Sequence, residues 1–289
     1  MEKIKLLSPS KVNLTLRVLG KRDDGYHYIQ SIFQPINLFD EIEISLQDGN
    51  GINLEESGIE IPDRTENIVI KAAKLYLKNC DLEKHISINL KKRIPIGAGL
   101  GGGSANGAAI LIGLNKILKK FDDNKLTELA IQLGADVPFF IRSTTALIEG
   151  VGEKITLLNS FPLFYYVLLF PGIHISTKDV YQQWDKGSNV TDTVDSRLLI
   201  EQFTQKDKLP LINDLEKPAF QLFPELNKFK DMFYSLDVKN VIMTGSGSTL
   251  IGVFTEENEA KEVYNYLNVS AEFEVYLAEG IKGWHFLVD

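Results

Sequence analysis

The chain has 289 residues, of which 44% are apolar and 24% are charged, and its formal net charge is −8. This composition predicts a soluble globular protein with a substantial core, built as one large domain or two of ordinary size. The acidic balance counts against a general nucleic-acid binder, because such domains carry a basic excess. No apolar run approaches the ~20 residues that a membrane-spanning helix needs.

The usage of cysteine and histidine points to a reducing compartment. Cys80 is the one cysteine, so no disulfide can form within the chain. It lies in a helix-like stretch, which favours a buried, neutral thiol over a catalytic one. The four histidines have no cysteine or acidic partners at metal-ligand spacing, so no structural zinc site is expected. The N-terminus lacks the apolar core of a signal peptide, and we predict a cytoplasmic protein.

The hydrophobic pattern of the first half predicts alternating strands and helices. Apolar residues alternate with polar ones near residues 12–18, 42–46 and 86–90, which predicts half-buried strands. Helical spacing of apolar residues appears near 68–76, after the glycines at 108–118, and at 124–134, where Gly134 ends the helix.

The second half has a similar mixture. It contains a buried strand at 164–172, helix-like segments over most of 178–236, a strand–glycine turn–strand unit at 240–254, a helix at 257–267 and a last strand at 272–280. A domain boundary near residue 150 is weakly marked, and no internal repeat is visible. The sequence therefore predicts a mixed α and β protein.

The most unusual segment is "IPIGAGLGGGSANGA", in which five of the seven residues from 97 to 103 are glycine. Gly97, Gly99 and Gly102 satisfy the dinucleotide-binding pattern G-x-G-x-x-G. Its context fails, because the preceding "LKKRIPI" is cationic and no strand follows to place an acidic residue on a ribose. The Walker A pattern also fails, because no Lys-Ser/Thr follows the glycines.

What remains is a glycine loop that enters a helix at Ser104. Successive glycine N–H groups can converge on an anion, and a helix N-terminus adds roughly half a positive charge. The Ser104 hydroxyl could cap the helix or reach a metal-bound phosphate, and Lys92 and Arg93 supply cations just upstream. The competing interpretation is a tight turn before a helix of small residues. We favour a phosphate cradle, because the glycines exceed what a turn needs.

Three further segments offer chemistry. In "SPSKVNLTL", Lys11 and Asn13 lie on the same, polar face of a strand. In "LGADVPFF", Asp136 lies in an apolar setting, where a carboxylate is either paired or functional. The segment 244–249, "TGSGST", is a second loop of glycines and hydroxyls. Each has a plainer alternative: an exposed lysine, a turn or helix-capping aspartate, and a hairpin turn.

These segments, in this order and spacing, resemble the galactokinase–homoserine kinase–mevalonate kinase (GHMP) superfamily over nearly the whole chain. The pattern K-x-N-L-x-L followed by "DGYH" and "FQ" narrows the resemblance to its branch in the non-mevalonate route to isoprenoid (terpenoid) precursors. The implied fold class is α+β in two domains. Residues 1–150 would form the nucleotide-binding N-terminal domain, resembling ribosomal protein S5 domain 2, and residues 151–289 a C-terminal α/β sandwich.

The resemblance also implies an activity. The chain would be an ATP-dependent phosphotransferase that acts on the C2 hydroxyl of cytidine-diphosphate methylerythritol and releases ADP. Mg²⁺ is expected, and the substrate would bind in the cleft between the domains. Both partners are small molecules, and neither nucleic acid nor a membrane takes part. The metal ligands stay unassigned, with Ser104 as a candidate.

The resemblance implies three groups of site residues. Asp136 would be the catalytic base and Lys11 its electrostatic partner. The acceptor would contact Asn13, Tyr26, His27, Phe33, Thr177 and Tyr181, with Tyr181 stacking on the cytosine. ATP would contact Asn67, Lys92, Pro95, Ile96, Gly97, Ala98, Gly99, Leu100, Gly101, Gly102, Gly103, Ser104 and Ala105. Ala105 and Tyr181 depart from the family's commonest residues, serine and phenylalanine.

Three alternatives stay open from the sequence. A sibling kinase acting on homoserine or mevalonate would share the glycine loop without needing "DGYH". A dinucleotide-dependent oxidoreductase would bind a nicotinamide cofactor at the loop. A nucleotide-binding module without activity would have no use for Asp136 beside Lys11.

Overall fold

The computed structural model describes residues 2–60, 67–187, 193–204 and 209–283. His285 and part of the predicted helical region 178–236 lie outside these ranges. Within them, helices and strands are mixed along the whole chain, as the hydrophobic pattern predicts. No helix in these ranges is long and apolar enough to cross a bilayer.

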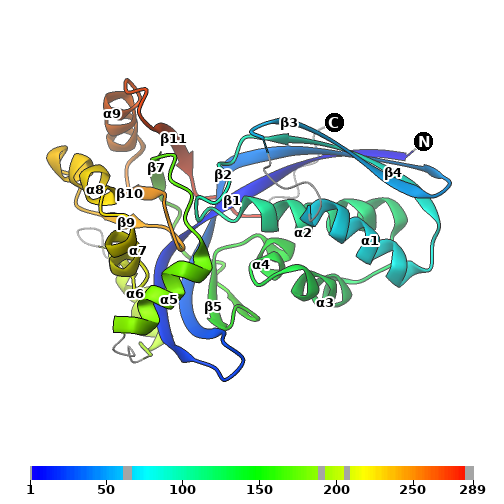
Figure 1. The fold of residues 1–289 in the computed structure, drawn as a ribbon, viewed down its shortest axis with the longest axis horizontal. Coiled ribbons are helices and arrows are strands. Elements are labelled where there is room, and N and C mark those ends of the chain that lie inside the picture. The colour runs from blue at the N-terminus through cyan, green and yellow to red at the C-terminus, as the bar shows by residue number, and fades with distance from the viewer. Residues whose placement is uncertain (1, 61–66, 188–192, 205–208, 284–289) are drawn as a thin grey trace.

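The first sheet has seven strands and carries its helices on one side (Figure 1). Its main path runs β3-β4-β2-β1-β8, and β5 extends it from β2 and pairs in turn with β6. The strands are β1 (Glu2–Lys21), β2 (His27–Asp48), β3 (Gly51–Gly58), β4 (Lys84–Lys92), β5 (Ala146–Gly150), β6 (Lys154–Leu157) and β8 (Ile212–Asn213). The helices are α1 (Ile68–Cys80), α2 (Gly102–Leu118), α3 (Asp123–Leu133) and α4 (Val137–Arg142).

The second sheet has four strands in the order β11-β7-β10-β9, all antiparallel. Helices lie on its outer side, away from the first sheet (Figure 1). The strands are β7 (Tyr165–Phe170), β9 (Val241–Met243), β10 (Leu250–Phe254) and β11 (Glu274–Glu279). The helices are α5 (Thr177–Gly187), α6 (Ser196–Gln202), α7 (Glu216–Leu222), α8 (Leu226–Ser235) and α9 (Glu257–Leu267).

Three hydrophobic clusters hold these layers together. One lies between the first sheet and α1–α4, and a second lies between the second sheet and its outer helices. The third joins the two halves, because Val12 and Leu14 of β1 belong to the same cluster as Tyr166 and Leu168 of β7. Strands β6 and β8 pair with the first sheet although they come from the second half of the chain. The domain boundary near residue 150 stays a prediction.

Strand β1 differs from the half-buried strand that its alternation predicts. Every residue from 8 to 16 is buried, on both faces. Val12 and Leu14 of this stretch belong to the cluster between the two halves, whereas Lys11 and Asn13 line the cavity beside the glycine loop. Alternation in this strand therefore separates a core from a functional site, both hidden from bulk solvent.

Candidate active site

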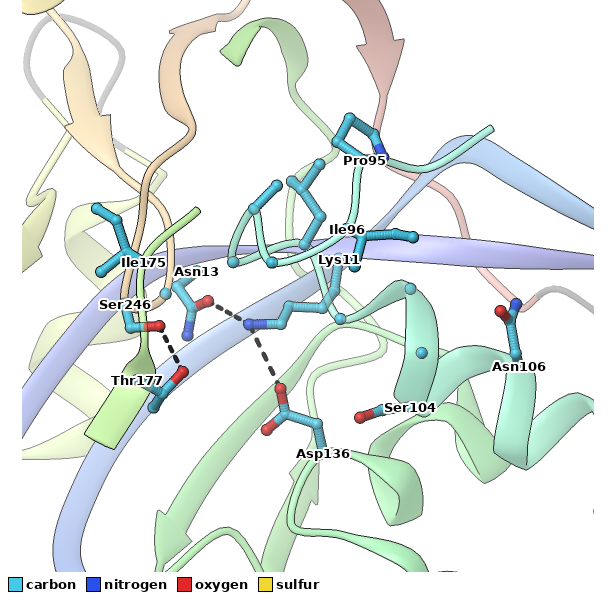
Figure 2. Close-up of a pocket in the computed structure, with 18 of the residues that line it drawn as sticks. Lys11, Asn13, Pro95, Ile96, Ser104, Asn106, Asp136, Ile175, Thr177 and Ser246 are labelled. Carbon is cyan, nitrogen blue, oxygen red and sulfur yellow. Dashed lines mark hydrogen bonds and ion pairs between the residues drawn. The ribbon is translucent and has the colours of Figure 1, made fainter. Parts of the chain in front are cut away.

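Lys11 and Asp136 form the charged centre of the site. The Lys11 Nζ lies 3.6 Å from the Asp136 Oδ2 and donates a hydrogen bond of 2.6 Å to the Asn13 Oδ1 (Figure 2). Lys11 and Asn13 lie on one face of β1, as the sequence predicts, whereas Asp136 comes from the turn before α4. The lysine side chain is 4% exposed and the aspartate side chain 33% exposed. The exposed-lysine alternative is therefore wrong.

Burial of Lys11 lowers its pKa below the ordinary value, although the Asp136 carboxylate opposes this shift. The ammonium group also lies 4.5 Å from the centre of the Phe33 ring, which offers a weak attraction to a cation. A buried cation beside a more exposed carboxylate suits a reaction in which negative charge grows between the two groups.

Asp136 is not a helix-capping aspartate in the usual sense. It occupies the N-cap position of α4, but its side chain makes no capping hydrogen bond. A capping role would turn its oxygen toward the N–H groups of the next turn. The carboxylate instead lines the cavity beside Lys11, which leaves an oxygen available to accept a proton.

The glycine loop opens helix α2 earlier than the sequence predicts. The helix begins at Gly102 with Gly101 as its N-cap, because Gly101 adopts a left-handed φ of 69° and its carbonyl accepts from the Ala105 N–H. Ser104 is therefore not the cap, which corrects one of the two roles considered for its hydroxyl. Figure 2 shows that hydroxyl directed toward the side where Asp136 lies.

The shape of the loop depends on three glycines with left-handed backbone. Gly97, Gly99 and Gly101 have φ values of 68°, 77° and 69°. The carbonyls of the residues between them are held, since Leu100 accepts from the Lys11 N–H and Ala98 from the Thr249 N–H. The N–H groups that start α2 have no acceptor within the helix. This arrangement is the usual backbone cradle for a phosphate.

The second glycine loop, 244–249, packs directly against the first. The Thr244 hydroxyl accepts from the Asn13 N–H, and the Ser246 hydroxyl lies 2.8 Å from that of Thr177 at the start of α5. A Cβ on Gly99 would meet the Thr244 carbonyl at 2.3 Å, so the two loops pack backbone to backbone. The loop does connect two antiparallel strands, β9 and β10, as a hairpin turn would, but it also lines the cavity through Gly245 and Ser246.

Aromatic rings form the far end of the site. His27 stacks on Tyr181 with ring centres 4.6 Å apart, and its Nε2 lies 2.7 Å from the Asp185 Oδ1. Burial acts to raise the pKa of Asp185, but hydrogen bonds from Lys21 and His27 outweigh it and hold the pKa below its ordinary value. An ionised carboxylate only accepts, so His27 Nε2 carries the proton and a neutral ring offers Nδ1 as an acceptor.

Tyr181 is also affected by its surroundings. Burial, with a smaller contribution from the Asp136 carboxylate, raises the pKa of its hydroxyl. Tyr26, by contrast, is 64% exposed and is not among the described residues that line the cavity. The structure therefore brings His27 and Tyr181 together and leaves Tyr26 at the surface.

One cavity of about 590 Å³ contains most of the predicted site residues, a size typical of small-ligand pockets. It is lined by Lys11, Asn13, Phe33, Asn67, Lys92, Asp136, Thr177, Tyr181 and every residue from Pro95 to Ser104. Ala105 is absent from that lining, because its side chain is buried in the core beneath α2. His27 reaches the cavity only through its contact with Tyr181.

Two cations upstream of the loop are less available than the sequence indicates. Lys92 is buried in an ion pair with Asp40 and also donates to Asn106. Arg93 pairs with Glu41. Strand β4 pairs parallel with β3 and antiparallel with β2, and it buries Lys92 by pairing it with Asp40 while Lys91 stays exposed.

Asn67 holds structure as well as lining the cavity. Its Oδ1 accepts from the Val69 N–H and so caps α1, and its Nδ2 donates to Glu56. Sequence reasoning missed Asn106, Ile175 and Ser246 among the lining residues, and Asp185 as the partner of His27. The second glycine loop was a visible signal for Ser246. Asp185 is four residues beyond Tyr181, so helical spacing places both on one face.

The described residues contain no cluster of three histidine, cysteine or acidic side chains that could hold a metal ion. Ser104 and Asp136 both line the cavity near the phosphate cradle. A magnesium ion needs few protein ligands when substrate phosphates supply the others. This pair of oxygen donors is compatible with such an ion.

Comparison with known proteins agrees with this geometry. The family model "GHMP kinases N terminal domain" matches residues 67–144, and "GHMP kinases C terminal" matches residues 198–271. A 4-diphosphocytidyl-2-C-methyl-D-erythritol kinase of Citrifermentans bemidjiense is 40% identical over 90% of this chain and 93% of its own length. The enzyme of that name from Clostridioides difficile is 36% identical, over 90% of each chain.

Solved structures give the same answer for the fold. A crystal structure of 4-(cytidine 5'-diphospho)-2C-methyl-D-erythritol kinase matches with a TM-score of 0.82 and 33% identity, over 96% of this chain and 100% of its own. Homoserine kinase from Cytophaga hutchinsonii matches with a TM-score of 0.72 at 17% identity, over 100% and 98% of the two chains, which shows a shared fold.

The α+β fold in two layered halves, the glycine loop and the full-length similarity agree with one another. The chain belongs to the GHMP kinases and, within them, to the family of 4-diphosphocytidyl-2-C-methyl-D-erythritol kinases.

Proposed function

We propose that this protein transfers the γ-phosphoryl group of ATP to the C2 hydroxyl of 4-diphosphocytidyl-2-C-methyl-D-erythritol, giving the 2-phosphate and ADP in the non-mevalonate isoprenoid route. The observation that carries the proposal is the ion pair between Lys11 and Asp136, 3.6 Å apart, in the same cavity as the glycine loop. The cavity also ends in stacked rings that suit a flat base.

The roles of the residues follow from the physics of phosphoryl transfer. Little covalent chemistry is required of the protein, so catalysis comes from positioning and charge stabilisation. The N–H groups at the start of α2 hold the phosphates of ATP. The Asp136 carboxylate accepts the proton of the acceptor hydroxyl as its oxygen attacks phosphorus and the bond to the ADP oxygen breaks. Lys11, beside Asp136, stabilises the negative charge on the oxygen that is losing its proton.

Magnesium would accompany ATP, with Ser104 and Asp136 as the oxygen donors nearest the cradle. When bound, the ion neutralises phosphate charge. The chain's own residues fix where the reactants lie. Asn13 holds the Lys11 ammonium group in place, and a hydrogen bond between Thr177 and Ser246 fixes two hydroxyl groups on the wall that the second half of the chain contributes.

The acceptor would lie with its cytosine near His27 and Tyr181. The His27 Nδ1 can accept from the exocyclic amine of cytosine, because Nε2 is committed to Asp185. Phe33, Asn13 and Thr177 line the same cavity as Tyr181 and Asp136, so the diphosphate and methylerythritol would contact them. We also propose a cytoplasmic location, supported by the single cysteine.

An acceptor panel tests the proposal. Purified protein with Mg²⁺ and ATP is given cytidine-diphosphate methylerythritol, homoserine or mevalonate, and ADP release is measured. We expect turnover with the first acceptor and a value of kcat/KM at least about 10³-fold lower with the others, which cannot use the rings at the far end. Comparable turnover with homoserine or mevalonate would favour a sibling kinase. Binding of ATP without turnover of any acceptor would favour a nucleotide-binding module.

A further inference from the structure

The Asp40 carboxylate is completely buried on β2 and has no role in the chemistry described above. Both of its oxygens are used. Oδ1 accepts from the backbone N–H groups of Arg93, at 2.7 Å, and of Ile94, at 2.9 Å. Oδ2 accepts from the Lys92 ammonium group and, at 2.9 Å, from the Asn106 Nδ2. A buried carboxylate with four donors is fully compensated for its lost hydration.

These four donors lie on both sides of the glycine loop. Lys92 is the last residue of β4, and Arg93 and Ile94 lead from that strand to Pro95. Asn106 lies in helix α2, beyond the loop (Figure 2). One carboxylate on a third element therefore joins the entry of the loop to its exit.

The loop between these two points is held at its middle by the second glycine loop and by the core. Its backbone passes through three left-handed glycines, each with much conformational freedom to lose. The Leu100 and Ala98 carbonyls are held by the Lys11 and Thr249 N–H groups, but these contacts fix only the middle of the loop. A cradle of N–H groups works only if its donors are placed to within about 0.5 Å.

We infer that Asp40 is a positioning residue for the phosphate-binding loop, and that its loss weakens ATP binding selectively while acceptor binding is kept. The inference rests on the proposed function, because it requires ATP at this loop. Asp40 is completely buried and does not line the cavity, so it cannot bind the nucleotide directly. It acts through the backbone of Arg93 and Ile94 and through Asn106.

A plainer account makes Asp40 only the counter-charge of buried Lys92. The two accounts differ in what they predict for Asn106, which is neutral. If only charge matters, removing the Asn106 amide has little effect on ATP. If the tie across the loop matters, removing either end has the same kind of effect, and the two effects overlap in the double variant. Asn106 also lines the cavity, but a direct contact of its amide with ATP would make the two effects add.

The test uses the full chain with the substitutions Asp40→Asn, Asn106→Leu and both together. Calorimetry measures the Kd of a non-hydrolysable ATP analogue and of cytidine-diphosphate methylerythritol, at a temperature below each variant's Tm. We expect the ATP-analogue Kd to rise roughly 10-fold or more for each single variant, since small misplacements in a site are costly. The double variant should lose less than the product of the two, and the acceptor Kd should stay within about 2-fold.

Gln34→Leu is the matched control. Gln34 is another completely buried polar side chain of β2, but its amide holds Thr145, Pro162 and Tyr166, away from the glycine loop. It should lower the Tm and leave the ATP-analogue Kd unchanged.

An ATP-analogue Kd within about 2-fold of the parent in folded Asp40→Asn protein would overturn the inference, as would an equal loss in the Gln34→Leu control. If Asp40→Asn does not fold, Asn106→Leu decides alone, and an unchanged Kd there overturns it. A parent protein that binds no ATP analogue would overturn both the inference and the proposed function, whereas tight binding by every variant would overturn only the inference.

Discussion

At the scale of single residues, the site combines groups that serve the fold with groups that cost it stability. Lys11 is the clearest case of the second kind. Its pKa is lowered because burial removes hydration that Asp136 and Asn13 only partly replace. The charged form is therefore less favourable in the folded chain than in the unfolded one, and this cost is retained for a chemical reason.

Replacing Lys11 with Met should lower kcat while leaving the Tm equal or higher. Since the folded-state pKa lies below the unfolded value, the unfolded chain binds more protons between the two pKa values, and wild-type stability rises with pH in that window. The Tm advantage of the variant should therefore be largest at neutral pH and shrink toward pH 10.5. Melting curves across this range test the sign, and a large loss of Tm at neutral pH would show that Lys11 is structural.

The glycine loop offers a test in which stability and binding move in opposite directions. A Cβ on Gly103, in the first turn of α2, would meet nothing within 4 Å. Gly103→Ala should raise stability by roughly 0.5–1 kcal/mol, as for other helical glycines. If phosphate approaches this backbone, ATP affinity should nevertheless fall.

Gly187→Ala is the control, because Gly187 also lies in a helix with open space around its Cα. It should leave ATP affinity unchanged. Equal ATP affinity in Gly103→Ala and the parent would mean that the phosphates lie elsewhere. Gly101 is a less suitable site for this test, because a Cβ there would lie 3.0 Å from the Lys11 Cγ.

At the scale of elements, the sequence predicted much of the site because its parts are local. The spacing of Lys11 and Asn13 places them on one face of a strand whatever the rest of the chain does. What local patterns could not predict is which donors are already occupied. Lys92 is a residue type that commonly binds phosphate, yet it is already paired with Asp40, which is distant in the sequence. The sequence did indicate that Asp40 is buried, because it lies two residues before Ile42 and four before Ile44, on the same face of β2.

The aromatic contact with α5 is also something that local sequence patterns could not predict. Nothing in the sequence around Tyr26 and His27 distinguishes an exposed ring from a stacked one, because the partner ring comes from α5. The β1–β2 turn places His27 against Tyr181 and leaves Tyr26 in solvent. The packing of two distant segments decides which aromatic side chain faces the ligand.

Tyr181→Ala should therefore weaken binding of cytidine-diphosphate methylerythritol by roughly 1–3 kcal/mol, the usual value of a lost stacking face. His27→Ala should have a similar effect through a lost hydrogen bond. ATP affinity should change little in both. Tyr266→Ala is the control, because Tyr266 is a 64% exposed tyrosine on α9. If ATP binding fell as much as acceptor binding, these rings would belong to a different pocket.

At the scale of the whole molecule, the site exists only where the two halves meet. Strand β1 pairs with β8, which comes from the second half of the chain, and Asn13 on β1 bonds to Thr244 beside β9. The class of fold could be predicted from the alternation of strands and helices. The pairing of β8 with a strand of the other half could not be predicted, because a strand of two residues leaves no periodic pattern.

Because residues of both halves line the cavity, a ligand bound there should stabilise the whole chain. A ligand at 100 times its Kd adds about 2.7 kcal/mol to the free energy of unfolding. We expect the ATP analogue and cytidine-diphosphate methylerythritol each to raise the Tm, and the two together to raise it further. Homoserine and mevalonate should not. A thermal-shift titration measures this, and equal shifts from mevalonate would contradict the assignment of the acceptor.

The central claim is that Asp136, paired with Lys11, takes the proton of the acceptor hydroxyl. The most direct test is the single-turnover rate of Asp136→Asn protein with saturating ATP and cytidine-diphosphate methylerythritol. The amide keeps the shape and removes the base, so we expect the rate to fall by roughly 10²–10⁴-fold, with both Kd values nearly unchanged and the fold intact. A single-turnover rate equal to the parent's in well-folded Asp136→Asn protein would contradict the account.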